Sequence, residues 1–184
     1  MEILTERLRL REITQDDFQA VHEYASDPET VRYMPFGPNT EEETREFIDR
    51  NLRRQKEQPR TDYGLGIILK SEDRLIGACG MHGVTEIQAS IGYVLNRGYW
   101  GHGYATEAAK ALVEYLFDEL GVHRVYASCD PDNHASVRVL EKVGMSLEGR
   151  LRENMVIHGE YRDSLIFGLL VNEWETVNKV QPDR

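Results

Sequence analysis

The sequence predicts an α/β protein with a mixed sheet, organised as one domain over residues 1–184 with a core over about residues 5–175. Two observations carry this prediction. Short apolar or alternating runs typical of strands recur along the chain, and segments with apolar residues at helical spacing separate them. Strands and helices interleaved in this order favour helices packed on a sheet. The 40% hydrophobic and 29% charged residues are ordinary globular usage.

The first third of the chain combines one strand with two helices. Leu8 and Leu10 alternate with arginines, which is typical of a strand with one solvated face. Thr14 and Thr40 are each followed three residues later by an acidic residue, the capping-box spacing that begins a helix. We therefore expect a strand near residues 7–11, helices over 16–25 and 40–55, and a loop from Pro28 through residues 34–38.

The rest of the chain is richer in strands. Apolar residues from Ala105 to Leu116 lie on one helical face, and Gly121 ends that helix. Asp132 or Asn133 caps a second, shorter helix that ends at Gly144. We expect strands over residues 63–69, 75–80, 87–95, 122–129, 145–151 and 164–170, with turns at 71–73 and 158–159.

Charge and cysteine usage exclude several classes of protein. The 32 acidic and 22 basic residues give a net charge of −10, which disfavours nucleic-acid binding. The longest nearly apolar run, residues 165–171, is too short to span a membrane, and the start of the chain does not resemble a signal peptide. Cys79 and Cys129 stand far apart, typical of free thiols in a reducing compartment. These features predict a cytoplasmic location.

The segment most informative about chemistry is residues 96–108, which follows a predicted strand and opens a predicted helix. Its glycines allow a tight turn and the close approach of a ligand. Successive N–H groups from Gly101 to Thr106 would point outward at the helix N-terminus, where they favour an anion such as a phosphate. A glycine-rich connection that only turns the chain is the alternative.

Two other phosphate-binding patterns fit this loop poorly. The P-loop needs Gly-Lys-Ser/Thr, whereas Tyr104 follows Gly103. A dinucleotide fingerprint needs a small residue where Thr106 stands, and it needs an early βαβ unit. An enzyme that binds a nicotinamide cofactor at this loop is therefore the weakest of the hypotheses.

Residues 99–108, Tyr-Trp-Gly-His-Gly-Tyr-Ala-Thr-Glu-Ala, resemble the acetyl-coenzyme A loop of the GNAT superfamily of N-acetyltransferases. The branch that is most similar includes the ribosomal-protein N-terminal alanine acetyltransferases. Further similarities occur in the same order along the chain, at residues 5–11, 91–95, 133–136, 139–145, 160–164 and 173–174. The resemblance implies a GNAT fold, in which two parallel strands of the central sheet splay apart.

The resemblance also implies a site for acetyl-CoA as cosubstrate. Tyr93, Val94 and Leu95 would offer backbone groups to the pantetheine and thioester, and Asn133 would hydrogen-bond the arm from the other side. An isolated Asn-x-x-Ser is otherwise a helix cap. The diphosphate would rest on the amides of Gly101, His102, Gly103, Tyr104, Ala105 and Thr106.

The implied reaction is direct transfer of the acetyl group from the thioester to a primary amine. A backbone N–H near Val94 or Leu95 would stabilise the oxyanion. Leu140 stands where many family members have a tyrosine that acts as the general acid. We therefore predict that Ser136 protonates the thiolate leaving group. The base position is also changed: Ser90 replaces the glutamate common in the branch. Glu86 is the base we predict, with His82 as an alternative acting through water.

The acceptor is left open as a protein N-terminus or a small-molecule amine, and a homodimer is suggested by family analogy alone. The spacing of the histidines predicts no metal site. The altered Ser90 and Leu140 positions favour one alternative, a CoA-binding sensor or regulatory domain without turnover.

Overall fold

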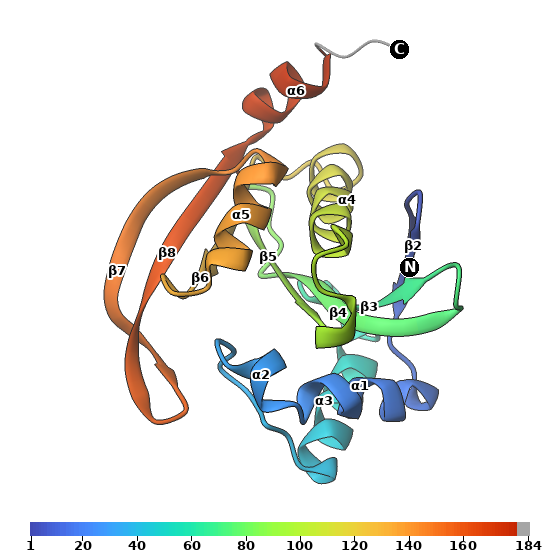
Figure 1. Cartoon of the computed structure of the whole chain (residues 1–184). Helices are drawn as coiled ribbons and strands as arrows, with labels where there is room; N and C mark the ends of the chain where they lie inside the picture. The colour runs from blue at the N-terminus through green and yellow to red at the C-terminus, as the bar shows by residue number, and fades with distance from the viewer. Residues whose placement is uncertain (180–184) are drawn as a thin grey trace.

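One sheet of eight strands, in the order β1-β2-β3-β4-β5-β6-β8-β7, runs through the molecule (Figure 1). The computed structural model describes residues 1–179. Neighbouring strands of the described chain are antiparallel except for β5 and β6, which are parallel. The strands are β1 (Glu2–Leu4), β2 (Leu8–Glu12), β3 (Tyr63–Leu69), β4 (Arg74–His82), β5 (Gln88–Leu95), β6 (Arg124–Cys129), β7 (Ser146–Ile157) and β8 (Glu160–Leu170).

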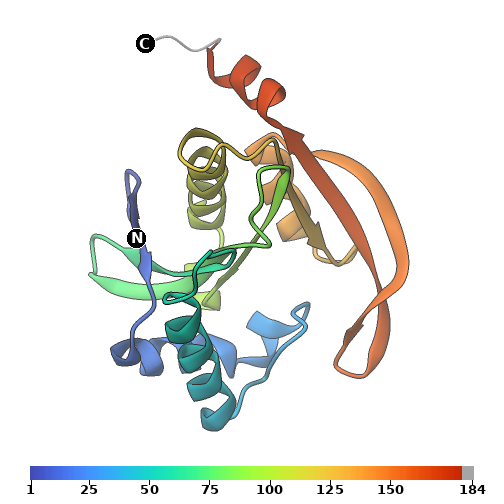
Figure 2. The ribbon, with the colours of Figure 1, turned by 180° about the vertical axis from the view of Figure 1, so that it is seen from behind.

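Helices cover both faces of this sheet. Figures 1 and 2 show α1 (Phe18–Ala25), α2 (Pro28–Val31) and α3 (Glu41–Arg54) on one side and α4 (Tyr104–Asp118) and α5 (His134–Val143) on the other. A last helix, α6 (Val171–Lys179), follows β8. The long β7–β8 hairpin curves away from the body of the molecule. No helix of the described chain is long and apolar enough to cross a membrane.

The two helical layers each bury their own apolar cluster against the sheet. The larger cluster lies under α4 and α5 and includes Leu112, Leu116 and Leu140, all almost inaccessible to solvent. The smaller cluster lies under α1 and α3 and includes Val21 and Ile48. Each fully buried side chain of this size contributes about 1.5–3 kcal/mol from burial. The central strands are thus held from both faces.

The predicted strands and helices occur where the hydrophobic patterns placed them, and most ends shift by one or two residues. The last two strands are longer than predicted: β7 continues six residues past 151, and β8 begins four residues before 164. The mixed α/β fold with helices flanking the sheet is therefore confirmed. Both capping boxes form: the Thr14 N–H donates to Asp17 at 2.7 Å and the Thr40 N–H donates to Glu43 at 2.7 Å. Gly144 ends α5 in the left-handed conformation at φ +100°.

Three elements were not predicted from the sequence. The segment beginning at Pro28 was expected to be a loop, but it forms α2, because proline is tolerated at the first helical position. The Asp27 side chain accepts a hydrogen bond from the Thr30 N–H at 3.2 Å and caps this short helix. The other two missed elements are the short edge strand β1 and the terminal helix α6.

Asp17 joins a helix start to the sheet through a buried ion pair. Its carboxylate accepts two hydrogen bonds from Arg11, each 2.7 Å, as well as those from Thr14. Burial opposes ionisation of Asp17, but these hydrogen bonds hold its pKa below the ordinary value of 3.8. The pair ties the start of α1, which Asp17 precedes, to Arg11 of β2.

We expect Asp17→Asn to lower the free energy of unfolding by about 2–3 kcal/mol, because Arg11 loses its charged partner. A group with a lowered folded-state pKa stabilises the fold above its unfolded value. The difference from wild type should therefore be complete above pH 3.8 and shrink as the pH falls through the lowered pKa. Denaturant titrations at several pH values measure it. Asp16→Asn, at an exposed neighbour, should change stability by less than about 0.5 kcal/mol.

Candidate functional site

The parallel strands β5 and β6 are paired over only three residues. Gln88, Ala89 and Ser90 pair with residues 124–126, and beyond Ser90 the two strands separate. On its other edge β5 stays paired with β4 as far as Leu95. The second half of β5 therefore presents one unpaired edge toward α5, and backbone polar groups there are available to a ligand.

The direction of backbone groups on β5 follows a period of two. The Arg124 N–H donates to the Ile87 carbonyl at 3.0 Å, so Ile87 faces β6. By the alternation, Tyr93 and Leu95 face the opening and Val94 faces β4. This differs from the expectation for Val94 as an oxyanion donor and leaves the Leu95 N–H in that position. The Leu95 carbonyl already accepts a hydrogen bond from Trp100 Nε1 at 2.8 Å.

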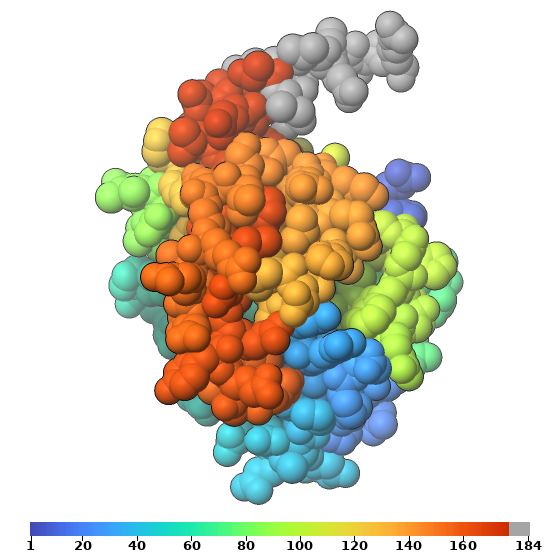
Figure 3. Space-filling model, turned by 60° about the vertical axis from the view of Figure 1, so that its left-hand side comes forward, coloured from blue at the N-terminus to red at the C-terminus, as the bar shows by residue number. Residues whose placement is uncertain are grey.

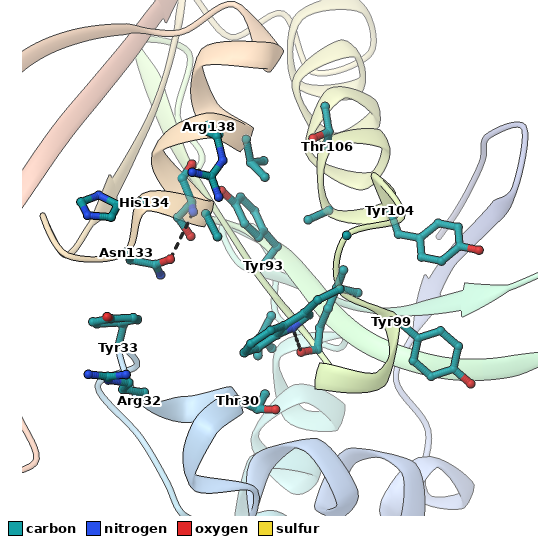
Figure 4. Close-up of a pocket in the computed structure, with 18 of the residues that line it drawn as sticks. Thr30, Arg32, Tyr33, Tyr93, Tyr99, Tyr104, Thr106, Asn133, His134 and Arg138 are labelled. Carbon is teal, nitrogen blue, oxygen red and sulfur yellow. Dashed lines mark hydrogen bonds between the residues drawn. The ribbon is translucent and has the colours of Figure 1, made fainter.

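The glycine loop leads directly into the N-terminus of α4. Gly101 and Gly103 have φ of +81° and +82°, a conformation that glycine adopts without strain. Gly103 occupies the cap position and has no side chain to satisfy the first-turn N–H groups of the helix. Those groups, on Tyr104, Ala105 and Thr106, form a ready anion site. Figure 4 shows the Tyr104 ring directed away from the opening, so this residue contributes backbone.

Arg7, in the turn between β1 and β2, and Glu107, in the first turn of α4, brace this loop. Arg7 Nε donates to Glu107 at 2.6 Å, and Arg7 Nη1 donates to the His102 carbonyl at 2.9 Å. Thr5 donates to the same carboxylate at 2.6 Å. Burial opposes ionisation, but the hydrogen bonds from Thr5 and Arg7 hold the pKa of Glu107 below its ordinary value. Residues near the start of the chain therefore hold the glycine loop and the first turn of α4 together.

The start of α5 forms the opposite wall. The Asn133 side-chain oxygen accepts a hydrogen bond from the Ser136 N–H at 3.1 Å, so Asn133 is a helix cap and also lines the opening. The turn before it is fixed by Arg162 of β8, which donates to Asp130 at 2.8 Å and to Asp132 at 2.7 Å. The polar run on β8 therefore positions Asn133.

Tyr93 places a hydroxyl group that sequence reasoning had not considered. Its hydroxyl donates to the Ser136 carbonyl at 3.4 Å, across the opening from β5 to α5. Burial raises the pKa of Tyr93, which keeps the hydroxyl protonated. The sequence did contain a signal for this position. Ile91, Tyr93 and Leu95 alternate along the strand, so their side chains share one face, and that face packs under α4 and α5. Leu140 is buried in the core, as an apolar residue should be.

These elements enclose a cleft of about 480 Å³. Figure 3 shows its three walls gathered on one face: the α2 segment in blue, the glycine loop in yellow-green and α5 in gold. In Figure 4, Tyr93 and Asn133 lie around the opening with Arg138 between α5 and α4. Sequence reasoning missed the cations of this cleft, which come from two distant segments: Arg32 follows α2, whereas Arg138 and Lys142 lie on α5.

The predicted site residues come together with two exceptions, His102 and Glu86. Tyr93, Val94, Leu95, Asn133 and Ser136 line the cleft, as do all the predicted loop residues other than His102. The ring of His102 contacts the Trp100 carbonyl at 2.8 Å, and its own carbonyl accepts from Arg7.

The second exception is Glu86, which is exposed at the opposite end of β5. Its carbonyl accepts a hydrogen bond from the His123 N–H at 3.1 Å. At about 3.3 Å per residue, Glu86 is more than about 20 Å along the chain from Val94. Glu86 also lines neither cavity at the site, so the geometry gives it no route to the reacting atoms.

A second cavity of about 610 Å³ lies on the α1 and α3 face of the sheet. It shares Met34, Tyr93 and Val94 with the cleft, so the two cavities meet at the middle of the free edge of β5. His82, the alternative base, lines this second cavity, and its Nδ1 lies 3.1 Å from the Asp62 carboxylate.

Neither a metal cluster nor a disulfide marks the site. Within residues 1–179, no group of three or more His, Cys, Asp or Glu side chains could hold a metal ion. Cys79 and Cys129 are free cysteines, as predicted, and burial raises the pKa of Cys129 to about 11. Both thiols are therefore protonated at neutral pH.

Comparison with known proteins identifies the family. A model described as an acetyltransferase (GNAT) domain matches residues 7–146. The chain is 38% identical over 175 residues to the uncharacterized N-acetyltransferase YnaD of Bacillus subtilis (strain 168), covering 95% of this chain and 99% of the relative. The crystal structure of a GNAT-family acetyltransferase from Bacillus anthracis has 37% identity and a TM-score of 0.82, with 94% and 99% of the chains covered.

A second solved structure shares the fold at 20% identity with a TM-score of 0.79, covering 92% of this chain and 99% of the other. It is spermidine N-acetyltransferase from Vibrio cholerae in complex with CoA and spermine. The chain thus belongs to the GNAT family of acetyltransferases, and the resemblance in its sequence is confirmed. It is an acetyltransferase enzyme.

We expect Glu107→Gln to raise the dissociation constant for CoA by about three- to tenfold, because Arg7 loses its charged partner and the loop loses its brace. Calorimetric titration measures this. Glu114→Gln, at an exposed position of the same helix, is the matched control and should bind CoA as wild type does. Equal affinity in the two variants would contradict the bracing role.

Proposed function

We propose that the protein transfers an acetyl group from acetyl-CoA to a primary amine, with acetyl-CoA bound in the cleft between β5 and α5. The observation that carries the proposal is the uncapped N-terminus of α4 at the mouth of splayed parallel strands. An amide cradle and an unpaired strand edge side by side suit a ligand that has a diphosphate at one end and an amide-bearing arm at the other.

The residues present fit each part of this cosubstrate. The amides from Gly101 to Thr106 would hold the diphosphate, and Arg138 and Lys142 supply positive charge in the same cleft. The Tyr93 backbone and the Asn133 side chain lie on opposite sides of the arm's path. A Cβ on Gly101 would meet nothing within 4 Å, so this loop is open toward the ligand.

The transfer requires one hydrogen-bond donor for the oxyanion and one proton donor for the thiolate. The Leu95 N–H faces the opening and would serve as the first. Ser136 is the proposed acid, and the Tyr93 hydroxyl, 3.4 Å from the Ser136 carbonyl, is a second donor at the same place. The acetyl carbon forms a bond to the amine nitrogen as its bond to sulfur breaks, and the thiolate takes up a proton.

The acceptor amine is either the N-terminus of a protein or a small molecule. Both classes agree with a second cavity that opens beside Val94 on the face of β5 opposite to the cleft. The V. cholerae structure named above contains spermine, which makes a polyamine one substance to test. We propose neither a nucleic acid nor a membrane as a partner, because the acetyl transfer requires neither. We place the reaction in the cytoplasm, where acetyl-CoA is available.

We expect Gly103→Val to raise the dissociation constant for acetyl-CoA at least about tenfold, or about 1.4 kcal/mol. Valine is strained at φ +82°, and its Cβ would lie 3.5 Å from Arg7 Nη2, so the change would disturb the loop that carries the amides. Calorimetry measures the affinity, and thermal unfolding reports the strain.

Gly121→Val is the matched control, since Gly121 also has positive φ but lies beyond the far end of α4. It should lose stability and keep its affinity. Equal loss of affinity in both variants would contradict the placement of the diphosphate.

We expect Ser136→Ala and Tyr93→Phe to lower kcat by about 10- to 100-fold while the dissociation constant for acetyl-CoA changes by less than about threefold. The reason is that each removes a hydroxyl needed only as the thiolate forms. Release of free thiol from acetyl-CoA, followed across a panel of amines, measures kcat. An unchanged rate in Ser136→Ala would assign the proton to Tyr93. Tight binding without thiol release from any amine would instead favour a non-catalytic sensor.

A further inference from the structure

The short helix α2 is a wall of the cleft that cannot hold its own position. It spans only Pro28–Val31, and isolated helices shorter than about 12–15 residues are at best marginally stable in water. Thr30 of this helix lines the cleft, as do Arg32 and Tyr33 directly after it. The position of the wall must therefore be set by contacts from other segments of the chain.

The start of α2 is tied to the segment that leads into the glycine loop. Asp27 caps the helix by accepting a hydrogen bond from the Thr30 hydroxyl at 2.7 Å, and its carboxylate lies 3.7 Å from Arg97 Nε. The Arg97 side chain is 60% exposed, and exposed ion pairs contribute little free energy. This tie alone gives only a weak hold on the wall.

The end of α2 is held by the tip of the β7–β8 hairpin. His158 Nε2 and the Val31 carbonyl oxygen are 3.2 Å apart, a contact between residues separated by 127 positions in the sequence. A carbonyl oxygen can only accept, so Nε2 is the donor. Val31 is fully buried, and the peptide group that carries this oxygen leads directly into Arg32. His158 therefore fixes the point at which the cleft-lining residues leave the helix.

The turn of the hairpin does not by itself account for a histidine. Ile157 and Glu160 are cross-strand partners, and His158 and Gly159 between them have φ of +51° and +84°. A two-residue turn with two positive φ values is typically Asn-Gly, Asp-Gly or Gly-Gly. The contact with Val31 gives a physical reason for the longer side chain at position 158.

The same hairpin also holds the opposite wall of the cleft. Arg162 of β8 donates to Asp130 at 2.8 Å and to Asp132 at 2.7 Å, in the turn that leads to Asn133. Four residues separate Arg162 from His158, which is about 13 Å along a strand. Figure 3 shows the hairpin, in orange, beside the α2 segment, in blue. One arm thus contacts α2 with its tip and the start of α5 farther along.

Two features make this arm stiff. Asp163 accepts hydrogen bonds from Arg150 Nε at 2.6 Å and from the Glu153 N–H at 2.9 Å, which pins an irregular part of β7 to β8. Ile157, next to the turn, is 8% exposed, although the rest of β7 is exposed or half-buried. The tip therefore lies against the body of the molecule.

From these contacts we propose that His158 is a positioning residue of the cleft. It fastens α2 to the hairpin, so that the two walls keep a fixed separation around the cosubstrate. The inference rests on the proposed binding of acetyl-CoA in this cleft. His158 does not itself line the cleft. When its tie is broken, the ligand must order α2 as it binds, and the cost of that ordering weakens binding.

His158→Asn separates this role from a contribution to stability. Asparagine is preferred at this position of the turn, but its side chain ends before the position of the histidine Nε2. We expect an unchanged or higher midpoint of thermal unfolding together with a three- to tenfold higher dissociation constant for CoA, about the factor for one lost hydrogen bond. Calorimetry measures the affinity. An unchanged dissociation constant, whatever the midpoint, would overturn the proposal.

His158→Gln is the matched rescue. The glutamine Nε2 can donate to the Val31 carbonyl from the same distance, although glutamine suits positive φ less well and should lower stability. Its affinity for CoA should be within about twofold of wild type. Glu160→Gln, an exposed change on the same hairpin, is the control and should bind CoA as wild type does. Equally weakened binding in all three variants would mean a general loosening of the hairpin and would overturn the assignment to His158.

Hydrogen exchange of the ligand-free protein keeps this inference separate from the proposed function. The Met34 N–H donates to the same Val31 carbonyl at 2.8 Å, so amide exchange over residues 28–34 reports on the end of α2. Exchange there should be about three- to tenfold faster in His158→Asn than in wild type, and His158→Gln should match wild type. Unchanged exchange in His158→Asn would overturn the tie even if CoA binds tightly. Faster exchange in a protein that fails to bind CoA would support the tie and count against the proposed function alone.

Discussion

The separation of β5 from β6 after Ser90 is the constraint on which the site depends. Parallel strands require a crossover, and here the crossover is the glycine loop followed by α4. Ending the pairing after three residues leaves the backbone of Tyr93 and Leu95 without a strand partner on that side. Because α5 stands opposite and the N-terminus of α4 stands at the mouth, the unpaired groups become a recognition surface for an extended ligand.

The proposed anion site lies in a chain with a net charge of −10. Acidic residues contribute to it indirectly. Glu107 holds Arg7, which holds the glycine loop, and Asp130 holds Arg162, which fixes the turn before Asn133. In each case a partly buried ion pair orients main chain that faces the ligand. The overall charge therefore says little about the local field, which is set by helix amides and by cations from α2 and α5.

The two faces of β5 line two different cavities, which we propose for the two reactants. Side chains alternate along β5, so Tyr93 turns toward α5 while Val94 turns toward α1 and α3. The cleft and the second cavity meet at these two residues. An arrangement of this kind lets a thioester and an amine approach the same point from opposite sides without sharing a binding surface.

Local patterns in the sequence determined much of this protein: the strands and helices from their periodicity, the helix starts at Thr14 and Thr40 from capping boxes, and the loop from glycines that need positive φ. Contacts between distant segments were decided by the tertiary structure. Arg7 meets Glu107 and Tyr93 meets Ser136 across the fold, while Glu86 lies far from the cleft although it precedes β5. Short-range spacing carries no information about such pairs, because packing of the sheet and helices sets which residues converge.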